Sequence, residues 1–167
     1  MTQLALINPR NAIEEDFVGC TFRNAARAVI QDADGKVALM YVARDGYYKL
    51  PGGGVDEGED MMDGLRRECQ EEAGCDIEVV GEIGSTLEYW KEQNEKQTSY
   101  CYFAKVSGEK GTPNFTDSEK KRGFAILWLP YEEALATIKG SSFSYYGADY
   151  MVPRDTLFLE AAKKYLS

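Results

Sequence analysis

The chain has 167 residues, 44% of them hydrophobic and 28% charged, with a formal net charge of −9, which is typical of one globular domain with its own core. This acidity argues against binding to a long nucleic acid, because such binding depends on Lys and Arg that neutralise phosphates. The sequence contains neither an apolar run near the roughly 20 residues of a membrane span nor an N-terminal secretory signal, so we expect a cytoplasmic protein without membrane contact.

Strand and helix patterns alternate along the chain, and several neighbouring strands are linked as hairpins. They predict an α/β (α+β) fold, a mixed sheet with helices packed on it. We interpret residues 1–167 as a single domain with an irregular N-terminal arm (1–18) and a C-terminal loop and helix (140–167). Residues 51–60 and 108–123 predict irregular loops. The predicted strands are residues 22–32, 36–44, 47–50, about 76–90, 98–107 and 125–130. The predicted helices are residues 60–73, 131–139 and 154–166.

The chain contains four cysteines and no histidine. No two cysteines form a Cys-x-x-Cys pair, so neither a Cys/His zinc site nor a thiolate–histidine nucleophile is expected. We interpret the cysteines as small apolar side chains in or near the core. Any general base must then be a carboxylate, a lysine, a tyrosine or a metal-bound hydroxide.

The predicted helix at 60–73 carries three glutamates beside its apolar stripe. At helical spacing, Glu72 lies about 40° to one side of Glu68 and Glu71 about 60° to the other, so the like charges repel one another. Converging carboxylates at the edge of a buried face suit Mg²⁺ or Mn²⁺. A solvated acidic face explains the same pattern equally well. The stripe itself consists of Met61, Met62, Leu65, Cys69 and Ala73.

Three consecutive glycines, Gly52 to Gly54, follow a predicted strand and precede this helix. Glycine lets the backbone approach a ligand closely or expose a carbonyl to a metal. A glycine-rich turn is a weak signal alone, but it gains weight at a fixed distance before a glutamate helix. Gly74 stands where the helix is expected to stop.

The segment from Gly53 to Cys75 resembles a Nudix box. After Gly53 come five residues, then Glu59, then seven residues, then the sequence RECQEEAGC. Every fixed glycine, glutamate and arginine stands at the family spacing, while Cys69 and Cys75 replace the usual aliphatic residues. The order of elements over about residues 20–140 is also similar to the family. The resemblance implies a Nudix-type α/β/α sandwich with a mixed sheet.

The resemblance also implies a metal-dependent hydrolase that cleaves the diphosphate of a nucleoside di- or triphosphate derivative by attack of water at phosphorus. Mg²⁺, with Mn²⁺ as the alternative, would be the cofactor. One of the box glutamates would act as base, and the residues leave open which one. The implied metal-binding carboxylates are Glu68, Glu71 and Glu72.

Further box residues receive implied roles. Gly53 would add a backbone carbonyl to the metal shell. Arg67 would act at the catalytic centre by holding a carboxylate in place, either Glu59 or Glu68, and an ordinary ion pair is the alternative. Other family members use one more glutamate from the loop before the tryptophan strand, for which Glu119 is the candidate here, with a solvated charge run as the alternative.

Three cations are candidate substrate contacts. Arg23 and Arg27 lie four residues apart in a predicted strand, so their side chains share a face, and a guanidinium binds phosphate with two hydrogen bonds. Lys49 precedes the glycines and would lie at the mouth of the metal site. Surface salt bridges are the alternative for all three.

Two other functions remain open beside hydrolysis of a small nucleotide. A non-catalytic Nudix module could sense a nucleotide, although such a sensor needs no complete set of glutamates. An isoprenoid diphosphate isomerase is disfavoured because, in the family, that chemistry uses histidine. The sequence leaves the physiological substrate open, and also the oligomeric state, with a homodimer as one alternative.

Overall fold

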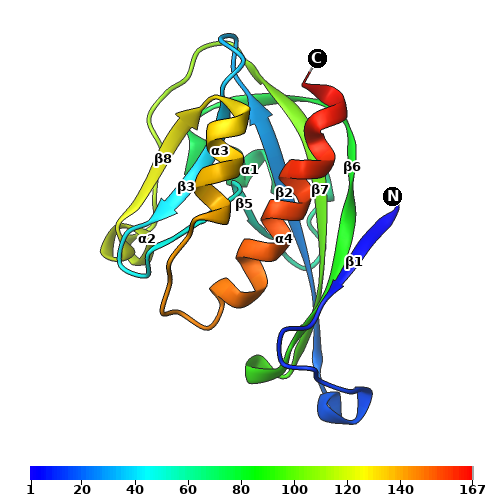
Figure 1. The fold of residues 1–167 in the computed structure, drawn as a ribbon. Coiled ribbons are helices and arrows are strands. Elements are labelled where there is room, and N and C mark those ends of the chain that lie inside the picture. Colours follow the sequence, from blue (N-terminus) through cyan, green and yellow to red (C-terminus); the bar gives the residue numbers. More distant parts are fainter. Residues whose placement is uncertain (167) are drawn as a thin grey trace.

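The computed structural model describes residues 1–166, and its centre is an eight-stranded mixed sheet (Figure 1). The sheet has the order β1-β6-β7-β2-β3-β4, with β5 paired to β2 and β8 paired to β3. β1 and β6 are parallel, as are β2 and β7, whereas the other pairs are antiparallel. The strands are β1 (Gln3–Ile7), β2 (Thr21–Gln31), β3 (Val37–Val42), β4 (Tyr47–Lys49), β5 (Gly52–Gly54), β6 (Asp76–Trp90), β7 (Glu95–Ser107) and β8 (Phe124–Leu129).

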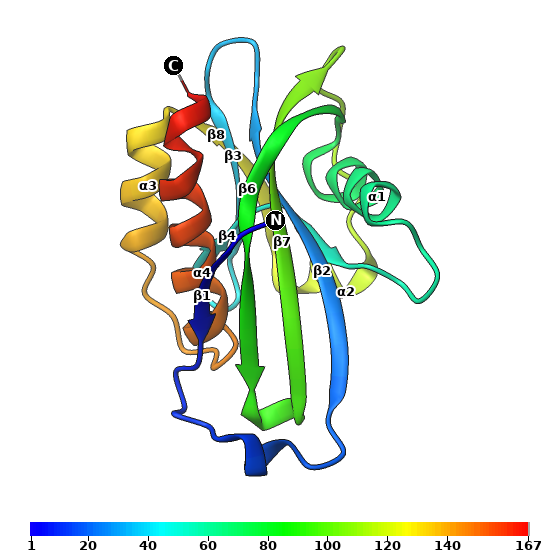
Figure 2. The same cartoon turned by 90° about the vertical axis from the view of Figure 1, so that its right-hand side faces the viewer.

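Helices cover both faces of the sheet. Figure 2 shows α1 on one side and α3 with α4 on the other. The predicted α/β/α sandwich with a mixed sheet is thereby confirmed. Within residues 1–166, no helix is both long and apolar enough to cross a membrane. The helices are α1 (Met61–Ala73), α2 (Asp117–Arg122), α3 (Tyr131–Lys139) and α4 (Ala148–Ala161), with short 3₁₀ turns η1 (Glu14–Phe17), η2 (Lys91–Gln93) and η3 (Ala162–Tyr165).

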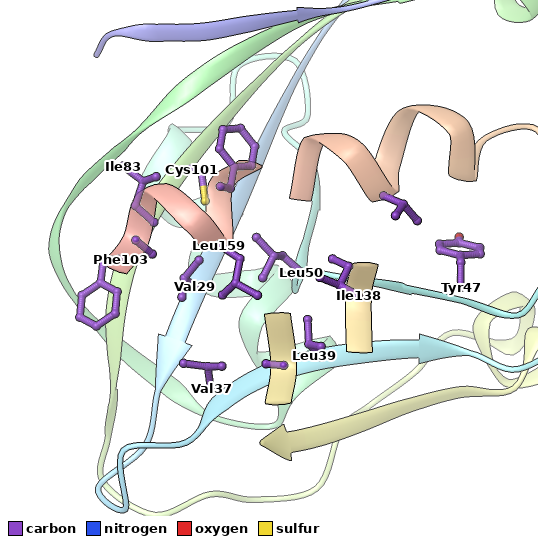
Figure 3. Close-up of a cluster of buried hydrophobic side chains, with 14 of the residues drawn as sticks. Val29, Val37, Leu39, Tyr47, Leu50, Ile83, Cys101, Phe103, Ile138 and Leu159 are labelled. Carbon is purple, nitrogen blue, oxygen red and sulfur yellow. The ribbon is translucent and has the colours of Figure 1, made fainter. Parts of the chain in front are cut away.

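Two apolar clusters fill the space on either side of the sheet. Under α3 and α4, Ile138 and Leu159 pack with side chains of the central strands, among them Val29 and Leu39 (Figure 3). The second cluster lies under α1 and joins its apolar stripe to β2, β3 and β7. β3 and the second half of β2 (residues 25–30) are buried on both faces, and apart from Arg27 these stretches are continuous apolar runs. Their burial fixes the position of the strand ends that carry the site.

α1 begins and ends as its sequence predicts. The Asp60 carboxylate accepts the N–H of Met62 at 2.8 Å and of Asp63 at 3.3 Å, which satisfies the first turn. Gly74 ends the helix at φ 66°, a left-handed conformation that favours glycine. The predicted stripe is confirmed, since Leu65, Cys69 and Ala73 are buried against the sheet, with Met61 and Met62 partly buried beside them.

The prediction of an irregular arm over residues 1–18 is wrong in part. β1 pairs with the outer edge of β6, in a register that places Ala5 beside Thr86. The two segments are about 80 residues apart in the chain, so no local turn signal announces the pairing. η1 follows and places Phe17 in a buried position.

Three other segments differ from their predictions. The predicted irregular loop 51–60 contains β5, which pairs with Ala25–Arg27 of β2. The predicted loop 108–123 ends in α2, where Thr116 and Glu119 form a capping box. α4 begins at Ala148, six residues before the predicted start, and contains Pro153. Proline removes one backbone hydrogen bond, and the burial of Ala148, Tyr150 and Val152 stabilises the helix despite that loss.

Candidate active site

A tight turn between β4 and β5 forms one wall of the candidate site. Gly52 lies at φ 131°, which favours glycine, and a Cβ atom there would overlap the Ala26 carbonyl oxygen. The Gly52 N–H donates to Glu72 Oε2 at 2.8 Å. The Gly52 carbonyl accepts from Lys49 Nζ at 3.3 Å and from Arg27 Nη1. One carboxylate and two cations therefore hold this peptide in place.

Glu72 is the most deeply buried of the three α1 glutamates, with 2% of its surface exposed. Its Oε1 lies 2.7 Å from Lys49 Nζ. Burial raises the pKa of Glu72, while the charge and hydrogen bond of Lys49 oppose that rise, followed by the Gly52 N–H and the charge of Arg27. The Glu72 carboxylate thus faces cationic and N–H partners from its own chain.

Glu68 lies directly against the backbone of Gly53. A Cβ atom at position 53 would overlap the Glu68 carboxylate, so glycine is required for this approach. The Glu68 Oε1 also accepts from Arg67 Nη1 at 2.8 Å. The fold therefore brings together two of the predicted metal-binding groups, which are 15 residues apart in the chain.

Arg67 contacts both carboxylates predicted as its partners. Its Nε and Nη2 atoms donate to Glu59 at 2.9 and 3.1 Å, and its Nη1 donates to Glu68. The same Nη1 lies 3.8 Å from Glu71 Oε2. The hydrogen bond from Arg67, with one from the Asp56 N–H, lowers the pKa of Glu59 to about 2. Arg67 thus connects the loop before α1 to the glutamates on α1.

Glu71 is the most exposed of the three glutamates, with 34% of its side chain accessible. Burial and repulsion from Glu68 raise its pKa, and Arg67 opposes the rise. The charges of Glu119 and Glu59 raise this pKa further. The Glu71 backbone carbonyl accepts the Asn114 N–H at 2.7 Å, which ties the loop before α2 to α1.

The oxygen donors suit a hard divalent cation, although they do not converge on one point. Among residues 1–166, no three acidic side chains form a cluster with the geometry of a metal site. Lys49 and Arg67 instead contact the glutamates. Carboxylates beside a glycine backbone are nevertheless the ligand chemistry that Mg²⁺ and Mn²⁺ prefer. After burial, repulsion from Glu68 is the main cause of the raised pKa of Glu71, and a bound cation would relieve that repulsion.

A cavity of about 320 Å³ opens beside the turn, and both cationic and anionic side chains line it. The three cations predicted as substrate contacts all line it, together with Glu68 and Glu72. Arg27 is 5% exposed, and its Nε has no hydrogen-bond partner among the described residues. A buried guanidinium N–H without a partner costs free energy unless a ligand satisfies it. The full lining is Arg23, Arg27, Tyr47, Lys49, Gly52, Gly53, Gly54, Glu68, Glu72, Thr116, Ser118, Glu119, Arg122, Phe124 and Met151.

Glu119 lines this cavity from α2, while Glu71 is not among its lining residues. The Glu119 carboxylate accepts the Thr116 N–H at 2.8 Å, and its own N–H donates to Thr116 Oγ1 at 3.3 Å. Glu119 therefore caps α2 as well as facing the cavity. A catalytic role for it stays a prediction.

Sequence reasoning missed two further lining residues, Arg122 and Phe124, and the buried pair on α4 that supports the turn. Tyr47, Arg122 and Phe124 form an aromatic and cationic end of the cavity. Arg154 and Asp155 on α4 lie buried behind the turn. The available signal was an Arg-Asp pair within an apolar helix pattern. Because the predicted helix began at residue 154, this pair fell at a helix end, where charged side chains are usually exposed, and its burial was not predicted.

Comparisons with known proteins agree with this geometry. The family model described as the NUDIX domain matches residues 21–146. An RNA pyrophosphohydrolase of Wolbachia pipientis subsp. Culex pipiens (strain wPip) is 37% identical over 67 residues, and the match spans 40% of each chain.

Two solved structures illustrate the likeness of the fold to that of known proteins. The MutT protein from Methanosarcina mazei Go1 superimposes with a TM-score of 0.62 at 18% identity, over 89% of this chain and 97% of that one. A NUDIX hydrolase from Nitrosomonas europaea gives a TM-score of 0.65 at 16% identity, over 85% and 88%. Because the family model covers most of the sequence, glycine turn and glutamate helix included, this chain belongs to the Nudix family.

Proposed function

We propose that the chain is a metal-dependent pyrophosphohydrolase that cleaves the diphosphate linkage of a small nucleoside diphosphate derivative by attack of water at phosphorus. The observation that carries this proposal is the cavity lined both by Glu68, which lies against Gly53, and by the buried Arg27, whose Nε has no hydrogen-bond partner among the described residues. Carboxylates and a buried guanidinium that line the same cavity match a diphosphate bound together with a cation.

We propose that Glu68, Glu71, Glu72 and the Gly53 carbonyl hold the cation, with Mg²⁺ as the first candidate and Mn²⁺ as the second. When bound, such an ion neutralises phosphate charge and acidifies a bound water. The donor set supports this assignment, since it offers carboxylates and a backbone carbonyl, and the Glu68 carboxylate occupies the space where a side chain at position 53 would lie.

The chain's own residues divide the remaining tasks. Arg27, through its free Nε, and Arg23 would bind phosphate oxygens and orient the phosphorus toward the glutamates. Lys49 would add charge at the same end once it exchanges part of its contact with Glu72 for a phosphate. Arg67 keeps Glu68 in place through its fixed pair with Glu59. One of the glutamates would accept a proton from the attacking water.

The substrate is proposed as a small nucleotide. The relative named an RNA pyrophosphohydrolase makes triphosphorylated RNA an alternative for this chain. The net charge of −9 favours the smaller ligand, because a long backbone would be repelled outside the cavity.

We also propose a single domain over residues 1–167, of which residue 167 lies outside the described part. A cytoplasmic location agrees with four unpaired cysteines.

The experiment measures nucleoside monophosphate formation from a panel of nucleoside diphosphate derivatives, and pyrophosphate release from a 5′-triphosphorylated RNA, with and without Mg²⁺. The E68Q variant is the test, and E132Q, which removes an exposed carboxylate of α3, is the matched control. Turnover that requires Mg²⁺ and is lost in E68Q alone supports the proposal. Binding of a nucleotide without turnover by the wild type would overturn it in favour of a sensor.

A further inference from the structure

The turn from Leu50 to Gly52 is held by hydrogen bonds from five different residues. The Leu50 N–H donates to Asp155 Oδ2 at 2.9 Å. The Pro51 carbonyl accepts the Ala28 N–H at 3.1 Å, and Gly52 is held by the contacts described above. Four of these residues belong to β2, β4 or α1, within the part of the chain that the family model matches. Asp155 comes from α4, beyond that part.

Arg154 fixes the Asp155 carboxylate from the neighbouring position of the helix. Its Nε and Nη2 donate to the two carboxylate oxygens at 2.6 and 3.1 Å. Its Nη1 lies 3.3 Å from Glu88 Oε2. All three side chains are fully buried. Such a buried ionic group often stabilises a fold no better than apolar residues of the same size, so its placement calls for a reason other than stability.

The same network reaches a second residue of the cavity. Glu88 Oε2 accepts from Gln97 Nε2 at 2.9 Å, and Gln97 Oε1 accepts from Arg23 Nη1 at 2.8 Å. Arg23 lines the cavity beside Gly54. From α4, a continuous series of hydrogen bonds therefore extends to both the glycine turn and a cation proposed to bind phosphate.

The buried charges around the turn balance one another within the protein. Three buried cations, Arg27, Lys49 and Arg154, accompany three buried carboxylates, Glu72, Glu88 and Asp155. Burial and the nearby Arg154 lower the pKa of Arg27, and the three carboxylates oppose that effect. Arg154 and Asp155 can therefore be removed together without changing the net charge around Arg27.

We propose that Asp155, oriented by Arg154, is a positioning residue. It fixes the Leu50–Gly52 turn and thereby directs the backbone of the next residue, Gly53, toward the cation. This inference rests on the proposed function for its consequence, but its structural part is independent of that function. Asp155 acts through the Leu50 N–H and touches no reacting atom. Removal of one supporting hydrogen bond of this kind typically weakens metal binding by about tenfold or more.

The test compares two double variants that differ in one acceptor. R154M/D155N keeps a side-chain oxygen for the Leu50 N–H, and R154M/D155L replaces it with a methyl group of nearly the same shape. Both remove one positive and one negative charge. NMR would follow the backbone amides of Leu50 and of Gly52–Gly54, measuring Leu50 amide exchange without metal and the shifts on titration with Mg²⁺. D32N, which breaks the ion pair between the buried Asp32 and the exposed Lys110 away from the cavity, controls for general destabilisation.

The Asn variant is expected to keep Leu50 protection and Mg²⁺ affinity within about twofold of the wild type. The Leu variant is expected to lose Leu50 protection and about tenfold in Mg²⁺ affinity, while D32N changes neither. Equal behaviour of the two double variants, in either direction, would overturn the role of the acceptor. If the Leu variant does not fold, R154M/D155A replaces it. Should the wild type not respond to Mg²⁺, the proposed function fails, and Leu50 exchange still decides the positioning role.

Discussion

Lys49 Nζ and Glu72 Oε1 form a buried ion pair at 2.7 Å, with 7% and 3% of the two side chains accessible. The pair joins the end of β4 to the last turn of α1 and includes one residue proposed to bind substrate and one proposed to bind metal. The carboxylate and the ammonium compensate each other's charge in the protein's interior. The carboxylate can then bind a cationic ligand and the ammonium an anionic one.

Breaking this pair should destabilise the fold. K49M leaves the Glu72 carboxylate buried without its cation, which typically costs about 3 kcal/mol or more. Equilibrium unfolding in urea measures the loss. K163M, which breaks an exposed pair with Glu132, is the control and should change stability little, because such pairs are screened by solvent. A loss in K49M no larger than in the control would show that Lys49 does not compensate the charge of Glu72.

Glu59 should give stability a defined dependence on pH. Its pKa is lowered from 4.5 to about 2, mainly by the hydrogen bond from Arg67. The unfolded chain therefore binds the proton more readily than the folded protein between these values. The contribution of Glu59 is complete above about pH 4.5 and disappears as the pH falls toward 2.

The measurement is the difference in unfolding free energy between the wild type and E59Q over this pH range. Taking the difference removes the titration of other carboxylates. The advantage of the wild type should shrink as the solution is acidified. A difference that does not vary with pH would contradict the assigned pKa.

Gly53 should tolerate no side chain. In G53A the new methyl group would displace the Glu68 carboxylate, and Mg²⁺ affinity should fall by about tenfold to a hundredfold, as for other changes beside a metal ligand. Isothermal titration calorimetry would measure it. G19A is the control: its φ of 66° strains an alanine, but its Cβ would meet no other atom and it lies in the arm, so Mg²⁺ affinity should not change. Unaltered Mg²⁺ binding in G53A would exclude this backbone from the cation site.

Addition of Mg²⁺ should raise the melting temperature. The three α1 glutamates repel one another at helical spacing, and a bound cation relieves that repulsion only in the folded state. At a concentration 100 times the dissociation constant, such binding stabilises by about 2.7 kcal/mol, which corresponds to roughly 5–10 °C for a domain of this size. Differential scanning fluorimetry, with Ca²⁺-free buffer and E68Q as comparison, checks it. The metal assignment weakens if Mg²⁺ leaves the wild-type melting temperature unchanged.

The sequence determined the local features of this protein by itself. The limits of α1 follow from the capping carboxylate of Asp60 and the left-handed Gly74, since both act within one helical turn. The apolar stripe followed from periodicity, and the spacing of the box residues indicated the family. These signals are short in range, so one segment contains all of them.

Only the tertiary structure decided which distant groups meet at the site. Glu68 lies against Gly53 because β2 pairs with β5 and supports α1, and no local pattern encodes that distance. The pairing of β1 with β6, the orphaned Nε of Arg27 and the contact of Asp155 with Leu50 depend on segments up to 105 residues apart. Burial of both partners in such contacts is a property of the packed fold. For that reason the sequence alone did not mark Arg154 and Asp155 as buried residues that support the site.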